Sequence, residues 1–119
     1  MLPPELRLTD GASFQQTVRV GKRAGSRTVV VHLDVGVDAP VGAPGPRVGF
    51  VVSKAVGNAV VRNRVKRRLR HLAREHVSSL PGSATLVVRA LPAAASASNA
   101  ELSVDLSRCL ARVGAAVTA

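Results

Sequence analysis

The sequence predicts a two-layer α/β sandwich in which helices pack on one small mixed β-sheet. Short β-branched segments that suit strands alternate with longer segments in which apolar residues recur with a helical period. Clusters of glycine and proline separate these segments. The chain has 119 residues and no internal repeat, which is enough for one hydrophobic core. We therefore expect a single domain spanning residues 1–119.

The expected order of elements is helix, strand, strand, helix, strand, helix. These elements lie at residues 10–19, 27–35, 47–52, 59–77, 84–90 and 98–113. Phe14 and Val18 share a face of the first helix, and Gly21 ends it. The β-branched segments TVVVHLDV and RVGFVVS predict the first two strands, which we expect to run antiparallel.

The connections and the last helix follow from local signals. The segment GVDAPVGAPGP is punctuated by glycine and proline, which predicts a flexible loop at residues 36–46. Alanine and serine dominate residues 92–98, which predicts a mobile connection. Ser98 and Glu101 have the spacing of a capping box at the start of the last helix. Residues 114–119 are expected to form a disordered tail.

The segment AVGNAVVRNRVKRRLR, residues 55–70, is the most basic part of the chain. On a helical wheel, its apolar stripe consists of Val61, Val65, Leu69, Leu72 and His76. The opposite side carries polar and basic residues, namely Asn63, Lys66, Arg67, Arg70 and Arg74, with Arg64, Arg68 and His71 on a flank beside them. The helix is therefore expected to dock by one face and to present guanidinium groups on the other.

The overall charge favours a negatively charged partner. Seventeen basic residues against seven acidic ones give a formal charge of +10, and most of the basic residues are arginines, which pair with phosphate through two donors. A membrane-surface helix would need bulky apolar residues opposite the charge, whereas this stripe holds only Val and Leu and is needed to cover the sheet. RNA or DNA binding is therefore the favoured interpretation.

The location of the protein follows from features that the sequence lacks. No apolar run is long enough to span a bilayer, and the first residues show no secretion signal. The single cysteine, Cys109, cannot form an internal disulfide and falls among the apolar positions of the last helix. These features are typical of a cytoplasmic protein.

A protein-borne active site is not expected. The seven acidic residues are scattered, the three histidines lack metal-ligand spacing, and no glycine-rich phosphate loop occurs. Two phenylalanines are the only aromatic residues, so extended base stacking is not expected either. Binding should be mainly electrostatic and shape-based.

The segment VGFVVSKAVGN followed by AVVRNRVKRRLR resembles the signature of the bacterial ribonuclease P protein family. This resemblance implies a left-handed crossover between parallel strands, a hand that is rare in other folds. It also implies that the protein joins a catalytic RNA, as a monomer in a 1:1 complex away from any membrane. In that complex Mg²⁺ and the RNA, not protein residues, would remove the 5′ leader from precursor tRNA.

The resemblance also implies roles for individual residues. Contacts with the catalytic RNA fall on Ser53, Lys54, Gly57, Asn58, Arg62, Asn63, Arg64, Lys66, Arg67, Arg68 and Arg70. A cleft for the tRNA leader would be lined by Phe14, Val18, His32 and Phe50, although the sequence leaves open whether Phe50 faces the core instead. Val18 replaces a usual aromatic residue, and His32 a usual tyrosine. The alternative is a structural RNA-binding protein, such as a ribosomal one, with no processing role.

Overall fold

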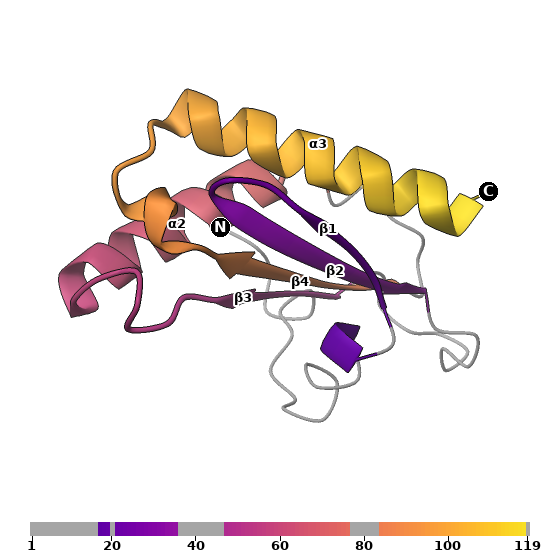
Figure 1. Ribbon diagram of the computed structural model, residues 1–119, viewed down its shortest axis with the longest axis horizontal. Coiled ribbons are helices and arrows are strands. Elements are labelled where there is room, and N and C mark those ends of the chain that lie inside the picture. The colour runs from indigo at the N-terminus through magenta and orange to yellow at the C-terminus, as the bar shows by residue number, and fades with distance from the viewer. Residues whose placement is uncertain (1–16, 20, 36–46, 77–83, 119) are drawn as a thin grey trace.

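The computed structural model describes residues 17–19, 21–35, 47–76 and 84–118. Residues 17–19 form a helical turn. The elements that follow are β1 (Lys22–Gly25), β2 (Val29–Val35), β3 (Arg47–Val51), α2 (Ala59–Ala73), β4 (Ala84–Ala90), the 3₁₀ helix η3 (Pro92–Ala95) and α3 (Asn99–Thr118). Figure 1 shows α3 running along one side of the sheet, while the helical turn lies on the other side.

The four strands form one mixed sheet in the order β1-β2-β4-β3. β1 pairs with β2, and β2 with β4, in antiparallel fashion, whereas β3 pairs with β4 in parallel. The predicted α/β sandwich with a small mixed sheet is confirmed. β3 runs opposite to β2 as predicted, but β4 lies between them. α2 connects the parallel strands β3 and β4, as the family resemblance implies, and the left hand of this crossover stays a prediction.

Strand β1 is absent from the sequence prediction. Its residues, KRAG, are basic or small, and only Ala24 is buried. Such a segment has little intrinsic β propensity, and it becomes a strand because β2 offers it backbone partners. Short, charged edge strands of this kind also protect a sheet from pairing with other chains.

Other differences from the predicted elements concern their ends and connections. α2 ends at Ala73 and not at residue 77, and α3 continues to Thr118, past the predicted start of a tail. The connection predicted to be mobile contains η3, and Ala94 and Ala97 are buried in the core. Alanine suits this place because its small side chain lets the backbone approach the core closely.

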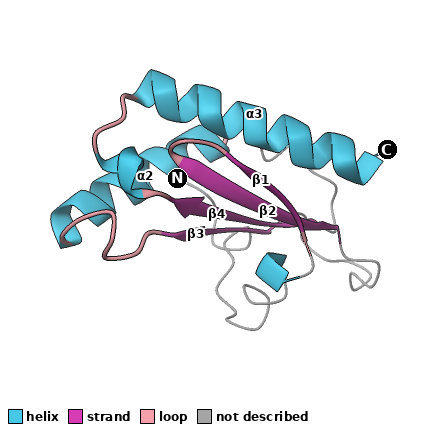
Figure 2. Cartoon of the chain, viewed as in Figure 1, coloured by secondary structure: helices cyan, strands magenta, loops and turns pink. Residues whose placement is uncertain are grey.

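The core lies between the sheet and the two long helices, which Figure 2 shows in cyan. Alternate strand residues point into it, and α2 and α3 contribute buried side chains at helical spacing. The predicted docking face of α2 and the predicted apolar position of Cys109 are therefore confirmed. The strand residues include Val29, Val31, Leu33, Val48, Phe50, Leu86 and Val88; the helix residues include Val65, Leu69, Leu102, Leu106, Cys109 and Val113. Burial raises the pKa of the Cys109 thiol. The other face of the sheet, turned away from α2 and α3, is called the second face below.

Candidate RNA interface

A tight turn sets the position at which α2 begins. The backbone N–H groups of Val56 and Gly57 donate to the carbonyls of Ser53 and Lys54, at 3.1 and 3.2 Å. Gly57 has a φ of +159°, and a Cβ there would lie 2.8 Å from Cγ1 of Val61. Only glycine therefore allows the chain to pass this close to the first turn of the helix.

Asn58 caps the start of α2. Its Oδ1 accepts a hydrogen bond from the N–H of Val61 at 3.0 Å, and its carbonyl accepts one from the N–H of Arg62 at 2.9 Å. The first turn carries no acidic residue. The helix thus starts immediately after the tight turn at residues 53–57. The positive end of its dipole and its basic side chains both contribute positive potential there.

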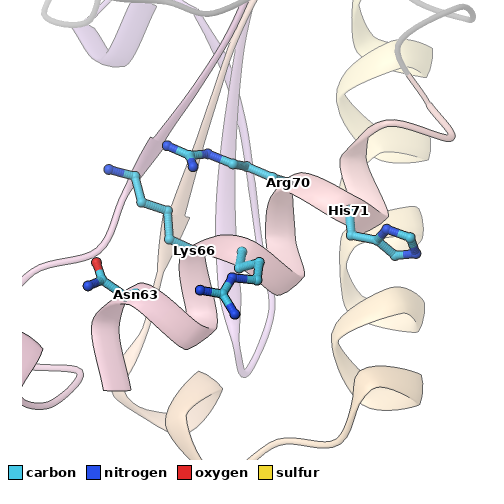
Figure 3. A pocket seen from close by; sticks show the side chains of 5 residues that line it. Asn63, Lys66, Arg70 and His71 are labelled. Carbon is cyan, nitrogen blue, oxygen red and sulfur yellow. The ribbon is translucent and has the colours of Figure 1, made fainter. Parts of the chain in front are cut away.

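Basic side chains cover the outward side of α2, as the helical wheel predicts. Asn63, Lys66, Arg67, Arg70 and His71 line a shallow hollow of about 420 Å³, here called the α2 hollow. Figure 3 shows Asn63, Lys66 and Arg70 pointing to one side of the helix and His71 pointing the other way. In the part of the chain that the structure describes, none of these five residues pairs with a carboxylate. The charges of Lys66, Arg67 and Arg70 are therefore available to an external anion.

The flank of α2 that lies beside η3 behaves differently. Arg64 Nη2 donates to the carbonyl of Ala95 at 3.3 Å, and Arg68 Nη1 donates to that of Ala97 at 3.4 Å. Arg68 is half-buried, while Arg64 is exposed. Arg62 is also half-buried, and its Nε atom has no hydrogen-bond partner. Of the arginines predicted to contact RNA, Arg67 and Arg70 thus line the α2 hollow, and Arg64 and Arg68 also hold the connection before α3. Arg62 belongs to neither group.

Three of the four residues predicted to line a leader cleft, Val18, His32 and Phe50, fall in the part of the chain that the structure describes. Phe14 falls outside the described residues. Val18 is 39% exposed on the helical turn, and His32 is 5% exposed on the second face. Phe50 belongs to the core cluster, so its assignment to the cleft is wrong. Residues of a strand point alternately to opposite faces, and Phe50 shares the core side with its partner Val88.

Two arginines beside His32 were not among the predicted site residues. Arg23 on β1 is the direct cross-strand partner of His32, and Arg89 on β4 pairs with Val30, two residues before His32 on the same face. Burial lowers the pKa of His32, and the charges of Arg23 and Arg89 lower it further. The sequence gives no signal for Arg23, because its strand, β1, is not predicted from the residues KRAG. A lone arginine within the apolar strand TLVVRAL was the available signal for Arg89.

The positive charge of these surfaces suits anions. Among the described residues, no group of three His, Cys, Asp or Glu side chains is arranged to hold a metal ion. Within the same residues, no helix combines the length and apolar character needed to cross a membrane. Fixed cations on a rigid helix suit a polymer of phosphates, since each guanidinium can form two charge-assisted hydrogen bonds with a phosphate.

Comparisons with known proteins agree with this chemistry. The family model described as Ribonuclease P matches residues 2–114. A protein of a Nocardioides species named Ribonuclease P protein component is 70% identical over 118 residues, which cover 99% of each chain. A Streptomyces avermitilis protein of the same name is 53% identical over 117 residues, with 95% of each chain covered.

A solved structure extends the likeness to the fold. The RNase P protein of Staphylococcus aureus superimposes with a TM-score of 0.77 at 28% identity, and the match covers 91% of this chain and 96% of that one. The family match and the sequence identities, which span nearly the whole chain, show that this chain belongs to the ribonuclease P protein family and so to the machinery of tRNA processing.

Proposed function

We propose that the protein binds the catalytic RNA of ribonuclease P through the outward side of α2 and the turn before it. The single observation that carries this proposal is the α2 hollow, whose cationic side chains have no carboxylate partner among the described residues. Ser53 and Lys54 are exposed on the turn and extend the same surface. Arg64 and Arg68 add donors at its edge while they remain bound to the carbonyls of Ala95 and Ala97.

The second face of the sheet is proposed to hold the single-stranded 5′ leader of precursor tRNA. Val18 is exposed on the helical turn, and the imidazole of His32 lies between two arginines. Val18 cannot stack on a base, so binding here should depend on charge and hydrogen bonds more than on stacking. Phe50 has no part in it because it faces the core.

Hydrolysis of the leader phosphodiester is assigned to the RNA subunit with Mg²⁺, and no catalytic residue is assigned to the protein. The protein would act by positioning, since binding both the catalytic RNA and the leader raises the effective concentration of the substrate at the ribozyme. Reconstitution of cleavage tests this positioning role.

The test is reconstitution at low Mg²⁺ with cognate catalytic RNA and labelled precursor tRNA. A product with a mature 5′-phosphate should appear rapidly only when RNA and protein are both present. Arg67→Ala should reduce this stimulation, whereas Arg108→Ala, which removes an exposed arginine of α3, should not. Tight RNA binding by the protein without stimulated cleavage would contradict the proposed positioning role.

A further inference from the structure

The second face carries a buried histidine whose ring has an unused hydrogen-bonding atom. His32 is only 5% exposed, and its Nδ1 is buried without a partner. An unpaired buried polar atom costs free energy, and most such atoms in proteins have a partner. His32 thus has a hydrogen-bonding group that the folded chain does not use, which points to an external ligand.

The neighbours of His32 show what kind of ligand this is. Arg23 lies directly across from it on β1, and Arg89 lies on the same face of β4. Both arginines are exposed, and neither forms an ion pair with a described residue. Two guanidinium groups around one imidazole create a site of positive potential, which suits an anion.

Other charged residues on this face do not cancel that potential at His32. Asp34 of β2 and Arg47 of β3 are both partners of Thr85 on β4, so these two opposite charges lie on either side of the same residue. The direct partner of His32 on β4 is the apolar Val87. Arg19 is the charged residue of the described helical turn and adds no negative charge.

We propose that Arg23, His32 and Arg89 form a subsite for one phosphate of single-stranded RNA, and that His32 takes up a proton when this phosphate binds. This inference rests on the proposed role of the second face in leader binding. It goes further by naming the group that is bound, the residues that bind it and a proton that accompanies binding.

The proton follows from the charges. Without RNA, burial and then the two arginines lower the pKa of His32, which keeps the ring neutral at physiological pH. A bound phosphate brings negative charge to Arg23 and Arg89 and provides an acceptor for a ring N–H of His32. Both effects favour the imidazolium form, so one proton passes from the solvent to the ring. Lower pH should therefore strengthen binding of the leader.

The test uses the reconstituted holoenzyme and two RNAs, a precursor tRNA whose scissile linkage is chemically blocked and the same tRNA without a leader. The ratio of their dissociation constants isolates the leader contribution from effects of pH on the rest of the complex. For the unmodified protein, this ratio should grow about tenfold between about pH 7.5 and about pH 5.5, within the limit set by uptake of one proton.

Two variants locate the proton. His32→Gln keeps a hydrogen-bonding side chain that does not titrate, so leader discrimination should become independent of pH. His76→Gln is the matched control, because His76 lies three residues after the end of α2, beside Ser107, and not on the second face. The control should retain the full pH dependence. Calorimetry in two buffers of different ionisation enthalpy should show proton uptake by the unmodified protein, which decides the point if His32→Gln does not fold.

The outcomes separate this inference from the function on which it rests. Equal affinity for both RNAs at every pH would overturn leader binding by the second face and this inference with it. Leader discrimination that does not vary with pH in the unmodified protein, or that varies equally in His32→Gln, would overturn the inference alone. Equal pH dependence with the leaderless tRNA would also overturn it, since the phosphate would then belong to another part of the complex.

Discussion

The outward side of α2 and the second face of the sheet are both basic, but they arrange their charges in opposite ways. The α2 hollow takes its side chains from consecutive turns of one helix, and none of them is buried. The second face takes one residue from each of three strands, Arg23, His32 and Arg89, and places a buried imidazole between two exposed guanidiniums.

The two arrangements of charge respond to different properties of a bound ligand. Exposed cations on a helix respond to the density of phosphate charge and to salt, because solvent screens them. A buried, titratable ring with an unpaired nitrogen responds in addition to pH and to the position of an acceptor. The α2 surface should therefore supply affinity for a large folded RNA, and the second face discrimination of a short single strand.

The largest expected effect is a loss of folding stability when the buried side of α2 is cut back. Leu69 is fully buried on the core side of α2. Leu69→Ala should therefore lower the free energy of unfolding by about 2–5 kcal/mol. Denaturation by urea measures this change. Val60→Ala is the control, because Val60 lies on the same helix with 75% of its surface exposed. Equal stability of the two variants would mean that α2 does not depend on the core contact of Leu69.

The next effect is a loss of RNA affinity with no change in folding stability. Arg67→Ala should weaken binding to the catalytic RNA by about 1–3 kcal/mol, the range for hydrogen bonds to charged groups. Stability should be unchanged because Arg67 is exposed. The slope of log affinity against log salt should also become shallower by about 0.7–0.9 for one lost phosphate contact. Binding titrations at several salt concentrations measure both quantities, and an unchanged slope would contradict a phosphate contact.

Arg64 sharpens the same comparison within α2. Arg64→Ala should also weaken RNA binding, by about 1–3 kcal/mol, but it additionally removes the bond to the carbonyl of Ala95. Hydrogen exchange of the backbone amides in residues 92–98 should therefore become faster in Arg64→Ala and stay unchanged in Arg67→Ala. Identical exchange in the two variants would show that Arg64 does not hold this connection.

A smaller effect is expected at the start of α2. Asn58→Ala removes the side chain that accepts from the N–H of Val61, which should cost about 0.5–2 kcal/mol of stability. Asn63→Ala removes the same kind of side chain from the interior of the helix, where no capping bond is lost, and should not destabilise. The difference between the two variants in thermal or chemical denaturation measures the cap.

The smallest effect is the pH dependence of stability that His32 produces. Its pKa is lowered in the folded protein by burial, Arg23 and Arg89, so the unfolded chain binds protons more readily as the pH falls. The free protein should lose stability as the pH drops below about 6.5, the value for an unperturbed histidine. Denaturation midpoints at about pH 7.5 and about pH 5.5 should differ less in His32→Gln than in the unmodified protein. An equal loss of stability in His32→Gln and in the unmodified protein would show that His32 is not the source of the pH dependence.

Local patterns were enough to identify most of the helical and strand segments. Short segments are enough to predict that Val65 and Leu69 share the buried face of a helix. They are also enough to predict that Ser98 and Glu101 cap the last helix. The structure confirms the pair, since each of these two residues accepts a hydrogen bond from the backbone N–H of the other. The basic side of α2 was equally accessible, because one helical wheel places all its residues.

Strand pairing was not accessible in this way. The residues KRAG do not predict a strand. The residues around Phe50 do not indicate which face of the sheet its side chain points to. Both depend on register with β2 and β4, whose residues lie far along the chain. The same holds for residues 92–98, whose small side chains suit a mobile segment as well as a close approach to the core.

Local sequence is therefore sufficient to predict the α/β class, the basic helix and the side by which this helix docks, because these depend on contacts between residues a few positions apart. Folding brings Arg23, His32 and Arg89 together and turns Phe50 toward the core. It also allows Arg64 and Arg68 to hold the connection before α3. Each of these arrangements joins segments that are distant in the sequence, and the packing of the whole chain around one core decides which segments become neighbours.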